Sequence, residues 1–556
     1  MSIRIRLSMR NKKKNRKLKK TSFLKNVVIL VVAHVFIKII GIVNKIYLTN
    51  REGFGDAGNA IYSSAFQVYA LFLTITSVGI PNAVSKLVSE RLAIGDSKGA
   101  HKVFKVAVIS FGMIGFLASL ILFKFSHYIT CNLIQIPEAE LSLLALSPSI
   151  FFVAITSAVK GYFNGRENLN VGASSQTIEQ IFKTIITIVL IEIIAQTTGL
   201  DTRVMAAGTA VATTLSEITC FMYLFKYYTS VRKEVANEIK HSVNYTYRGI
   251  RRTIKDILNV SIPMSIAPIL GGINKNIDSM TIVRSLKNFM TETEAKLQYG
   301  ILSGKVDTIV AFPLSFNSAF SSVLIPAVSA ARASGNFEYA NKKIKFSMLI
   351  SLLIGVPSTV GIIVLAEPIL HLLFPNQPDG AFLLQISSIS ITFIMLSQNI
   401  NAVLHGIGKI VVPAISLVIG LVIKLILNNI LVGINPDIFV LGGTAGAATS
   451  TVICHIITFG IELSIMNKYV KVDLRLSHVL KILLSTLMMG ITSGFILHCL
   501  KAFFVEKICM MLTIIAAIII YMLLILIFKV FSVEEIKAIP CGEKIYIFLK
   551  KIKLYE

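Results

Sequence analysis

The 556 residues are 54% hydrophobic and only 15% charged, and their mean hydropathy is +0.74. Soluble domains carry about 25% charged residues, so this composition excludes an ordinary soluble fold and indicates a membrane protein. The net charge of +26 would suit nucleic acid, but ten basic residues cluster before residue 22 and most others fall in short connections. We interpret the charge as a topology signal and expect no nucleic-acid partner.

Apolar runs long enough to cross a hydrocarbon core of about 30 Å as helices recur along the whole chain. They predict an all-α polytopic membrane protein with fourteen transmembrane helices, near residues 24–48, 60–88, 104–125, 142–163, 172–194, 204–227, 258–284, 300–326, 344–366, 382–405, 410–432, 443–466, 478–500 and 509–531. The first run is too long for a secretory signal and is interrupted by Lys38 and Lys45, so we expect it to remain as a helix.

The distribution of Lys and Arg predicts the orientation, because cytosolic loops carry the excess of both. Basic residues gather in the connections after the second, sixth and eighth spans, whereas the connection 367–380 has neither Lys nor Arg. We therefore predict a multi-pass protein of the bacterial plasma membrane with both termini cytosolic. One exception is the segment 284–299, which places Lys287 and Lys296 on the predicted outer side beside Glu292.

An internal repeat relates two halves of the chain. Gly41-x-x-Asn44-Lys45 in the first span returns as Gly271-x-x-Asn274-Lys275 in the seventh, and Ile80-Pro81-Asn82-Ala83-Val84-Ser85 returns as Ile325-Pro326-Ala327-Val328-Ser329. The repeating unit spans six helices, an even number, so both copies enter the membrane in the same direction. Parallel repeats of this kind are typical of transporters that enclose a cavity and work by alternating access.

The repeat divides the chain into six segments. They are a basic cytosolic N-terminal segment (1–22), a first six-helix repeat (23–228), a basic cytosolic linker (229–256), a second six-helix repeat (257–468), two further transmembrane helices (478–531) and a cytosolic C-terminal tail (532–556).

Several stretches carry a resemblance to a known family, among them Lys38-Ile-Ile-Gly41, Gly79-Ile-Pro-Asn-Ala-Val-Ser-Lys-Leu-Val-Ser-Glu90 and Gly161-Tyr-Phe-Asn-Gly165-Arg166. The chain resembles the stage V sporulation protein B group and the MurJ-like lipid II flippases, within the multidrug/oligosaccharidyl-lipid/polysaccharide (MOP) exporter superfamily. The resemblance covers at least the first twelve spans.

The resemblance implies an exporter of an undecaprenyl-pyrophosphate-linked cell-wall glycan, with lipid II as the first candidate. It implies a cationic central cavity for the headgroup and a groove by the last two helices for the lipid tail. Another lipid-linked polysaccharide unit, of the O-antigen or teichoic type, is the alternative cargo. The expected partners are the lipid-linked glycan, the surrounding membrane lipids and the cell-wall synthesis machinery.

The cation pattern of the family is altered in this chain. MurJ-like proteins carry R-x-x-G-x-x-R-D in the first helix, where this chain has Lys38 at the first Arg, Asn44 at the second and Lys45 one position later. In the eighth helix the motif D-R-x-x-x-F-P is matched by residues 307–313 without the Arg, and Lys305 lies just before them. Cations are therefore retained at shifted positions, which leaves the substrate contacts and the glycan open.

Ionisable groups inside the spans cost about 2.5–3.5 kcal/mol each on insertion scales, so they mark candidate functional residues. The substrate-binding candidates are Lys38, Lys183 and Lys424 at mid-span, and Asn44, Lys45, Lys275 and Lys305 toward the outer helix ends. The lysines near helix ends also fit a structural interpretation, in which their stems extend to the interface. The mid-span lysines fit binding better, because fixed cations can replace the water around a pyrophosphate.

Four acids are candidates for binding a coupling cation or for pairing with a lysine: Glu179, Glu217, Asp278 and Asp307. Glu179 and Lys183 are four residues apart, so they form either a structural pair or a functional one. The driving force is either the membrane potential, worth about 2.3 kcal/mol per charge per 100 mV, or coupling to Na⁺ or H⁺. We expect no resident cofactor or metal, because the cysteines are scattered and no nucleotide-binding loop is present.

We predict a transporter rather than an enzyme. His34, His405 and His455 are isolated in apolar runs, which favours packing over metal binding, and no catalytic arrangement is present. The outer connections are short for a membrane-embedded glycosyltransferase. A cation-coupled drug extruder of the same superfamily is the rival transporter, but it would need acids for a positively charged cargo, whereas the mid-membrane excess here is basic.

Overall fold

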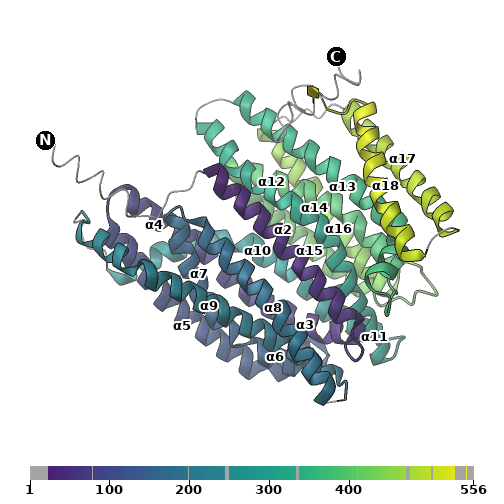
Figure 1. The fold of residues 1–556 in the computed structure, drawn as a ribbon, viewed down its shortest axis with the longest axis horizontal. Helices are drawn as coiled ribbons and strands as arrows, with labels where there is room; N and C mark the ends of the chain where they lie inside the picture. The colour runs from purple at the N-terminus through teal and green to yellow at the C-terminus, as the bar shows by residue number, and fades with distance from the viewer. Residues whose placement is uncertain are drawn as a thin grey trace. The chain divides into compact units, whose positions relative to one another are not determined.

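The computed structural model describes residues 23–77, 79–197, 199–243, 249–333, 337–409, 411–470, 476–502, 505–531 and 546–547. These residues form helices and connections, and none of them lies in a β-strand. The helices, in chain order, are α2 (Phe23–Asn50), α3 (Gly55–Ser77), α4 (Gly79–Ala93), α5 (Ser97–Tyr128), η1 (Ile129–Ile134), η2 (Pro137–Ala139), α6 (Glu140–Leu146), α7 (Ser149–Gly165), α8 (Leu169–Thr197), α9 (Thr202–Lys240), α10 (Ile250–Leu286), α11 (Glu292–Gly300), η3 (Ile301–Val306), α12 (Asp307–Ala333), α13 (Phe337–Leu373), α14 (Ala381–Gly406), α15 (Val411–Leu431), α16 (Gly443–Tyr469), α17 (Leu476–Lys501) and α18 (Glu506–Ile527) (Figure 1).

The predicted all-α polytopic fold is confirmed. Among the described residues, ten helices are long and apolar enough to cross a membrane, and each coincides with a predicted span. The other four predicted spans fall on the long helices α2, α8, α10 and α12. The segment 1–22 and nearly all of 532–556 lie outside the described residues, as do parts of the linker 229–256.

The outward surfaces of these helices are apolar, which is the reverse of a soluble protein. Met113 on α5, Ile491 on α17 and Ile518 on α18 are each more than half exposed. Helices satisfy their own backbone hydrogen bonds, so they can present such side chains to lipid without leaving polar groups unpaired. The chain is therefore a multi-pass membrane protein.

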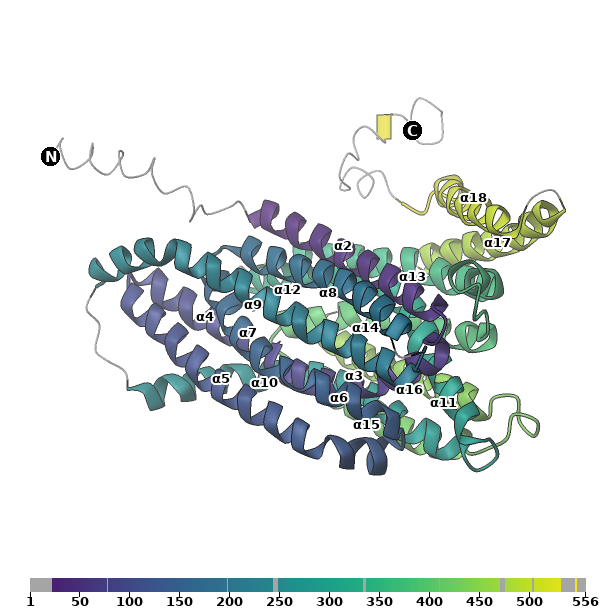
Figure 2. The ribbon, with the colours of Figure 1, turned by 60° about the horizontal axis from the view of Figure 1, so that its bottom comes forward.

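The chain divides into two compact units, 1–280 and 281–556, with the division inside α10. In unit 1, α2 packs along α8, α8 packs on α9, and α7 packs on both α4 and α5 (Figure 2). Glycines allow the approach of α7 to α4: a Cβ added at Gly161 would lie 2.7 Å from the Pro81 carbonyl oxygen, and one at Gly165 would lie 2.6 Å from that of Ser85. The boundaries of the predicted six-helix repeats stay a prediction.

Unit 2 contains an equivalent contact. Its helices α12, α13 and α16 all pack on α14, and α15 packs on α16. A Cβ added at Gly406, at the end of α14, would lie 2.8 Å from Val328 Cβ and 3.2 Å from the Ile325 carbonyl oxygen. The Ile-Pro segments that the sequence relates as repeats, beginning at Ile80 and Ile325, thus both receive the glycine end of another helix of their own unit.

The last two helices pack on each other and on α13 within unit 2. Ile482 and Met489 of α17 and Tyr521 of α18 share a buried apolar cluster with Leu353 of α13. The Tyr521 hydroxyl donates to the Leu353 carbonyl oxygen at 2.9 Å. This buried hydrogen bond satisfies the Tyr521 hydroxyl, and α13 contacts both helices of the pair.

The connection 284–299, which is the exception to the loop-charge pattern, is locally neutralised. Glu292 lies 2.8 Å from Lys287 Nζ and 2.8 Å from Lys296 Nζ. Thr291 caps α11 through a reciprocal hydrogen-bond pair with Glu294. Because one carboxylate binds both lysines, their charge is partly neutralised, and they argue less strongly against placing this connection on the outer side.

Candidate functional site

Polar side chains gather inside unit 1 where α3, α7, α8 and α9 meet. We call Tyr62, Lys160, Glu179, Lys183 and Glu217 the unit 1 polar cluster. Each of α3, α7 and α8 packs on α9, so residues of four helices can converge. All five residues fall inside predicted spans, where lipid cannot solvate a charge and each must find its partners in the protein.

Lys183 is held by an aromatic wall rather than by an acid. Its Nζ donates to the Tyr62 hydroxyl oxygen at 3.2 Å and lies 5.1 Å from the centroid of the Phe66 ring. The Tyr62 hydroxyl is 3.2 Å from Thr213 Oγ1 on α9, so a chain of polar groups crosses from α8 to α9. Neither a hydroxyl acceptor nor an aromatic face carries a negative charge, so Lys183 can attract an anion without first leaving an acid.

The acids of the cluster lie beside a different lysine. Glu179 Oε2 is 3.8 Å from Lys160 Nζ, and carboxylate oxygens of Glu179 and Glu217 lie within 4.8 Å of each other and of Cys220 Sγ. Glu217 is 5% exposed, and its Oε2 has no hydrogen-bond partner among the described residues. Two carboxylates this close repel each other inside a membrane, so the pair can take up a proton or a small cation.

The first helix contributes Asn44 and Gly41 to the packing between α2 and α8. Asn44 is buried, and its Oδ1 has no hydrogen-bond partner within the part of the chain that the structure describes. Gly41 faces Gln180, whose Nε2 would lie 3.7 Å from an added Cβ. Lys45 is half-buried, whereas Lys38 is exposed and therefore lies outside the packed interior of unit 1.

The seventh span places its candidates near α3. On α10, Asp278 and Asn274 are buried and Lys275 is half-buried. Asn276 Nδ2 donates to the Gln67 carbonyl oxygen of α3 at 3.0 Å, which fixes the rotation of α10 at this level.

The lysine candidates of unit 2 are fully buried. Lys305, in the π-helical segment η3, donates from Nζ to the Gln377 carbonyl oxygen at 2.7 Å, so it ties the start of α12 to the connection after α13. Lys424 on α15 is 0% exposed. One turn later, Asn428 Nδ2 donates to Thr281 Oγ1 at 3.0 Å. Asp307 is half-buried in the first turn of α12.

Sequence reasoning missed two features of these sites. The first is Lys160, which lies inside the predicted span 142–163. An ionisable residue within a span is a signal that the sequence already contains, so Lys160 could have been predicted as a candidate. A network of neutral side chains in unit 2 gave no such signal: Asn317 Nδ2 donates to Gln398 Oε1 at 2.8 Å, and Ser321 Oγ donates to Asn399 Oδ1 at 2.6 Å. Amides and hydroxyls occur throughout membrane helices, so only the fold shows that these meet.

Comparison with known proteins gives consistent matches over most of the chain. Residues 23–332 match the model of the polysaccharide biosynthesis protein family, and residues 299–430 match the MatE model. The chain is 23% identical over 531 residues to stage V sporulation protein B of Bacillus subtilis (strain 168), and this match covers 94% of this chain and 98% of that protein. It is 26% identical over 388 residues to lipid II flippase MurJ of the same strain, covering 67% of this chain and 71% of that protein.

A solved structure shares the fold. Lipid II flippase MurJ in an inward closed conformation superposes with a TM-score of 0.66 and 18% identity, over 90% of this chain and 98% of that one. At this level of identity the likeness establishes the arrangement of helices, and the predicted MATE/MurJ-like fold is confirmed.

Proposed function

The chain belongs to the polysaccharide biosynthesis protein family, and from that premise we propose that it flips an undecaprenyl-pyrophosphate-linked glycan from the cytosolic to the outer leaflet by alternating access. It is a MOP-superfamily membrane transporter related to stage V sporulation protein B and MurJ, and its family is one of transporters rather than enzymes. Lipid II is the first candidate cargo, because a curated relative carries that name.

The observation that carries this proposal is Lys183. A pyrophosphate sheds its water in a membrane only where fixed cations and donors replace that water. Lys183 supplies a mid-span cation whose contacts are a hydroxyl at 3.2 Å and an aromatic ring at 5.1 Å, so anion binding does not first require a salt bridge to break.

The neighbouring carboxylates supply a place for the coupling ion in the same proposal. Glu179 and Glu217 lie close enough that a bound H⁺ or Na⁺ relieves their repulsion, and Lys160 compensates one of the two negative charges. Exchange of that ion changes the charge beside Lys183 on the shared helix α8, which links ion binding to headgroup binding.

The test is translocation in reconstituted vesicles. Labelled lipid II and a second undecaprenyl-linked glycan are presented to the wild type, to Lys183→Ala, to Lys38→Ala and to the control Lys124→Ala, which removes an exposed lysine of α5. A charge-assisted contact is worth about 1.5–3 kcal/mol, so Lys183→Ala should slow transport at least about tenfold, and Lys124→Ala should not. Translocation of neither glycan by the wild type would end the flippase proposal.

The paired acids also favour one alternative, a cation-coupled extruder. The same vesicles therefore receive a fluorescent organic cation with an imposed Na⁺ or H⁺ gradient. Gradient-driven movement of that cation, abolished by Glu217→Gln and without glycan transport, would favour the extruder.

A further inference from the structure

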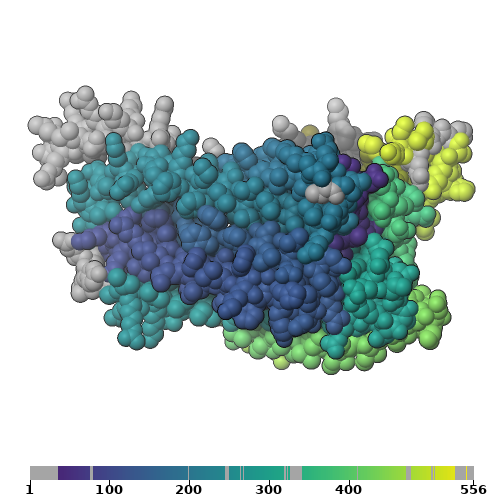
Figure 3. All heavy atoms as spheres, turned by 90° about the horizontal axis from the view of Figure 1, so that it is seen from below, coloured from purple at the N-terminus to yellow at the C-terminus, as the bar shows by residue number. Residues whose placement is uncertain are grey.

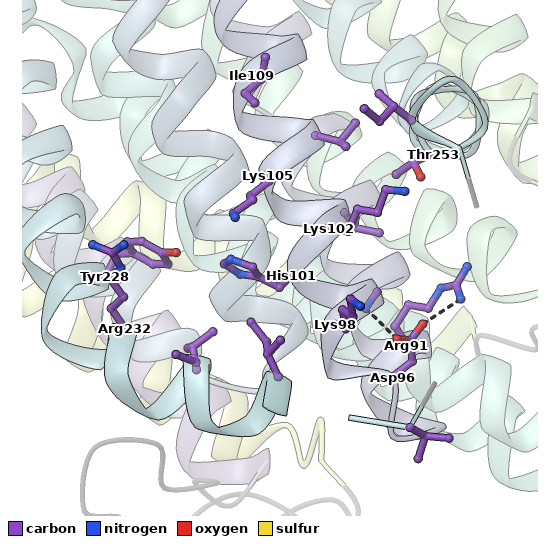
Figure 4. A pocket seen from close by; sticks show the side chains of 18 residues that line it. Arg91, Asp96, Lys98, His101, Lys102, Lys105, Ile109, Tyr228, Arg232 and Thr253 are labelled. Atoms are coloured by element: carbon purple, nitrogen blue, oxygen red, sulfur yellow. Dashed lines mark hydrogen bonds and ion pairs between the residues drawn. The ribbon is translucent and has the colours of Figure 1, made fainter. Parts of the chain in front are cut away.

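A positively charged pocket of about 860 Å³ lies in unit 1, where α4 and α9 end and α5 and α10 begin (Figure 4). Its lining contains five cationic side chains, Arg91, Lys98, Lys102, Lys105 and Arg232, and one carboxylate, Asp96. Lys98 and Lys102 precede the predicted third span, and Lys105 lies in its first turn, so the pocket is at the level of a membrane surface.

The acid in the lining is already engaged. Asp96 is 5% exposed, accepts from Arg91 Nη1 at 3.1 Å, and accepts from the Gly99 backbone N–H at 2.7 Å as the cap of α5. Asp96 thus offsets Arg91 and holds the turn. The lysines and Arg232 leave the pocket with a net positive charge that suits an anion.

The lining also includes His101, which carries a buried polar atom without a partner in the described part of the chain. His101 Nδ1 is buried and has no hydrogen bond among the described residues, although its ring packs against Phe104 and Tyr162 at 5.8 and 6.2 Å between centroids. In Figure 4, His101 and Lys105 extend from α5 on the side of Tyr228, whereas Lys102 extends toward Thr253. His101 and Lys105 therefore line the pocket on one side of α5, and Lys102 lines it on the other.

An apolar groove of about 400 Å³ adjoins the pocket and shares Ile109 with it. The groove runs over α5 and α7 and is lined only by apolar side chains and Gly112. Figure 3 shows the blue part of the chain, to which α5 belongs, at the surface of the molecule. From Val108 to Leu117 the lining of α5 spans nine residue steps, about 14 Å at 1.5 Å per residue. That is about half of a 30 Å hydrocarbon core, or one leaflet.

We propose that the pocket and groove together bind an anionic glycerophospholipid of the membrane. Its phosphate lies on the Lys105 side of α5, with Lys98 and Lys102 adding to the positive potential of the same pocket, and an acyl chain follows the groove past Ile109 and Gly112. The leaflet length of the groove favours a phospholipid over a longer polyprenyl chain. The site is complete within unit 1, so it does not depend on the flippase proposal, and binding is measured without transport.

Lipid binding to the purified full-length protein tests the headgroup contact. Native mass spectrometry follows retention of phosphatidylglycerol against phosphatidylcholine in the wild type, in Lys98→Gln/Lys102→Gln/Lys105→Gln and in the control Lys124→Gln. Juxtamembrane lysines each contribute about fivefold, so three should give up to about 100-fold preference for the anionic lipid. The triple variant should lose that preference and the control should keep it. Equal retention of both lipids by the wild type would overturn the proposal, whatever the variants do.

A second pair of variants tests the groove. A Cβ at Gly112 would make an ordinary contact, 3.5 Å from Ile155 Cγ1, so Gly112→Ala should bind lipid as the wild type does. Gly112→Leu fills the groove and should reduce phosphatidylglycerol retention at least about tenfold with every lysine in place. Unchanged retention would refute the acyl-chain path. Stronger retention of undecaprenyl pyrophosphate than of phosphatidylglycerol, or a lipid-free dimer, would overturn the assignment to a phospholipid.

Discussion

Lys160 is the residue that allows two carboxylates to share the interior of unit 1. Its Nζ lies 3.8 Å from Glu179, and Glu217 beside that acid is nearly inaccessible to solvent. In a medium of low dielectric constant, an uncompensated pair of acids would cost several kcal/mol or would bind a proton. The charge of Lys160 therefore offsets one of the two carboxylates and stabilises the fold.

The variant Lys160→Met tests this role. It should lower the free energy of unfolding by about 1–3 kcal/mol, less than for a fully buried pair, because the Lys160 and Glu179 side chains are 15% and 26% exposed. Thermal unfolding in detergent at pH 7 measures the loss. The double variant Lys160→Met/Glu179→Gln should recover part of it, since the second change removes the unpaired charge. A single variant as stable as the wild type would show that the ion pair is dispensable.

The short helix α11 shows how one connection is held at the membrane surface. Glu292 bridges Lys287 and Lys296, and these hydrogen bonds lower the pKa of its carboxyl from 4.5 to about 2. Because the pKa is lower in the folded protein, the stabilisation by Glu292 is present above about pH 4.5 and is lost as the pH falls toward 2.

Glu292→Gln should accordingly destabilise the protein most above pH 5, and the difference from the wild type should shrink as the pH falls. Melting temperatures of both proteins at pH 6 and pH 3.5 provide the measurement. Glu338→Gln removes an exposed pair with Lys342 in which Glu338 is 82% exposed, and it should change the melting temperature little at either pH. A difference for Glu292→Gln that grows on acidification would contradict the bridge.

Glycine contacts determine how closely the helices of unit 1 approach. At Gly161 an added Cβ would lie 2.7 Å from the backbone oxygen of Pro81, so the backbone of α4 would have to shift. Gly161→Val should therefore cost about 1–3 kcal/mol and reduce the yield of folded protein. Gly460→Val is the matched control, because nothing lies within 4 Å of a Cβ there. Both variants place a β-branched residue in a helix, but only Gly161→Val also creates a steric overlap. Size-exclusion profiles and thermal unfolding of the two variants therefore separate the overlap from the change in helix propensity. Equal losses in the two would argue against the α4–α7 contact.

At the scale of the whole molecule, the distribution of Lys and Arg predicts that both termini are cytosolic. In a cysteine-free background, Asp379→Cys should react with a membrane-impermeant maleimide added to intact cells, because it lies in the predicted outer connection. Ser8→Cys should react only after the cells are opened. The opposite labelling pattern would invert the topology and move the lysine-rich pocket to the outer surface.

The positions of the helices and the transporter class could be predicted from the sequence. Lipid imposes long apolar runs, so all fourteen predicted spans coincide with helices that the structure describes. The predicted site was less accessible to such reasoning. Lys183, which could have paired with Glu179, instead contacts Tyr62, and Glu179 lies 3.8 Å from Lys160. Lys305, just before α12, is buried and donates to a backbone carbonyl oxygen.

The sequence by itself determined that the chain is a helical membrane protein, where its spans lie and which charges those spans contain, because the cost of inserting a polar group depends on composition and length. Only the tertiary structure decided which of those charges meet. Membrane helices are apolar almost all round, so their pattern does not indicate how each is rotated about its axis, and that rotation brings Lys183 to Tyr62 and Glu179 to Lys160. The rotation of α5 about its own axis likewise places its lysines in a pocket next to an apolar groove, and the length of that groove is about the thickness of one leaflet.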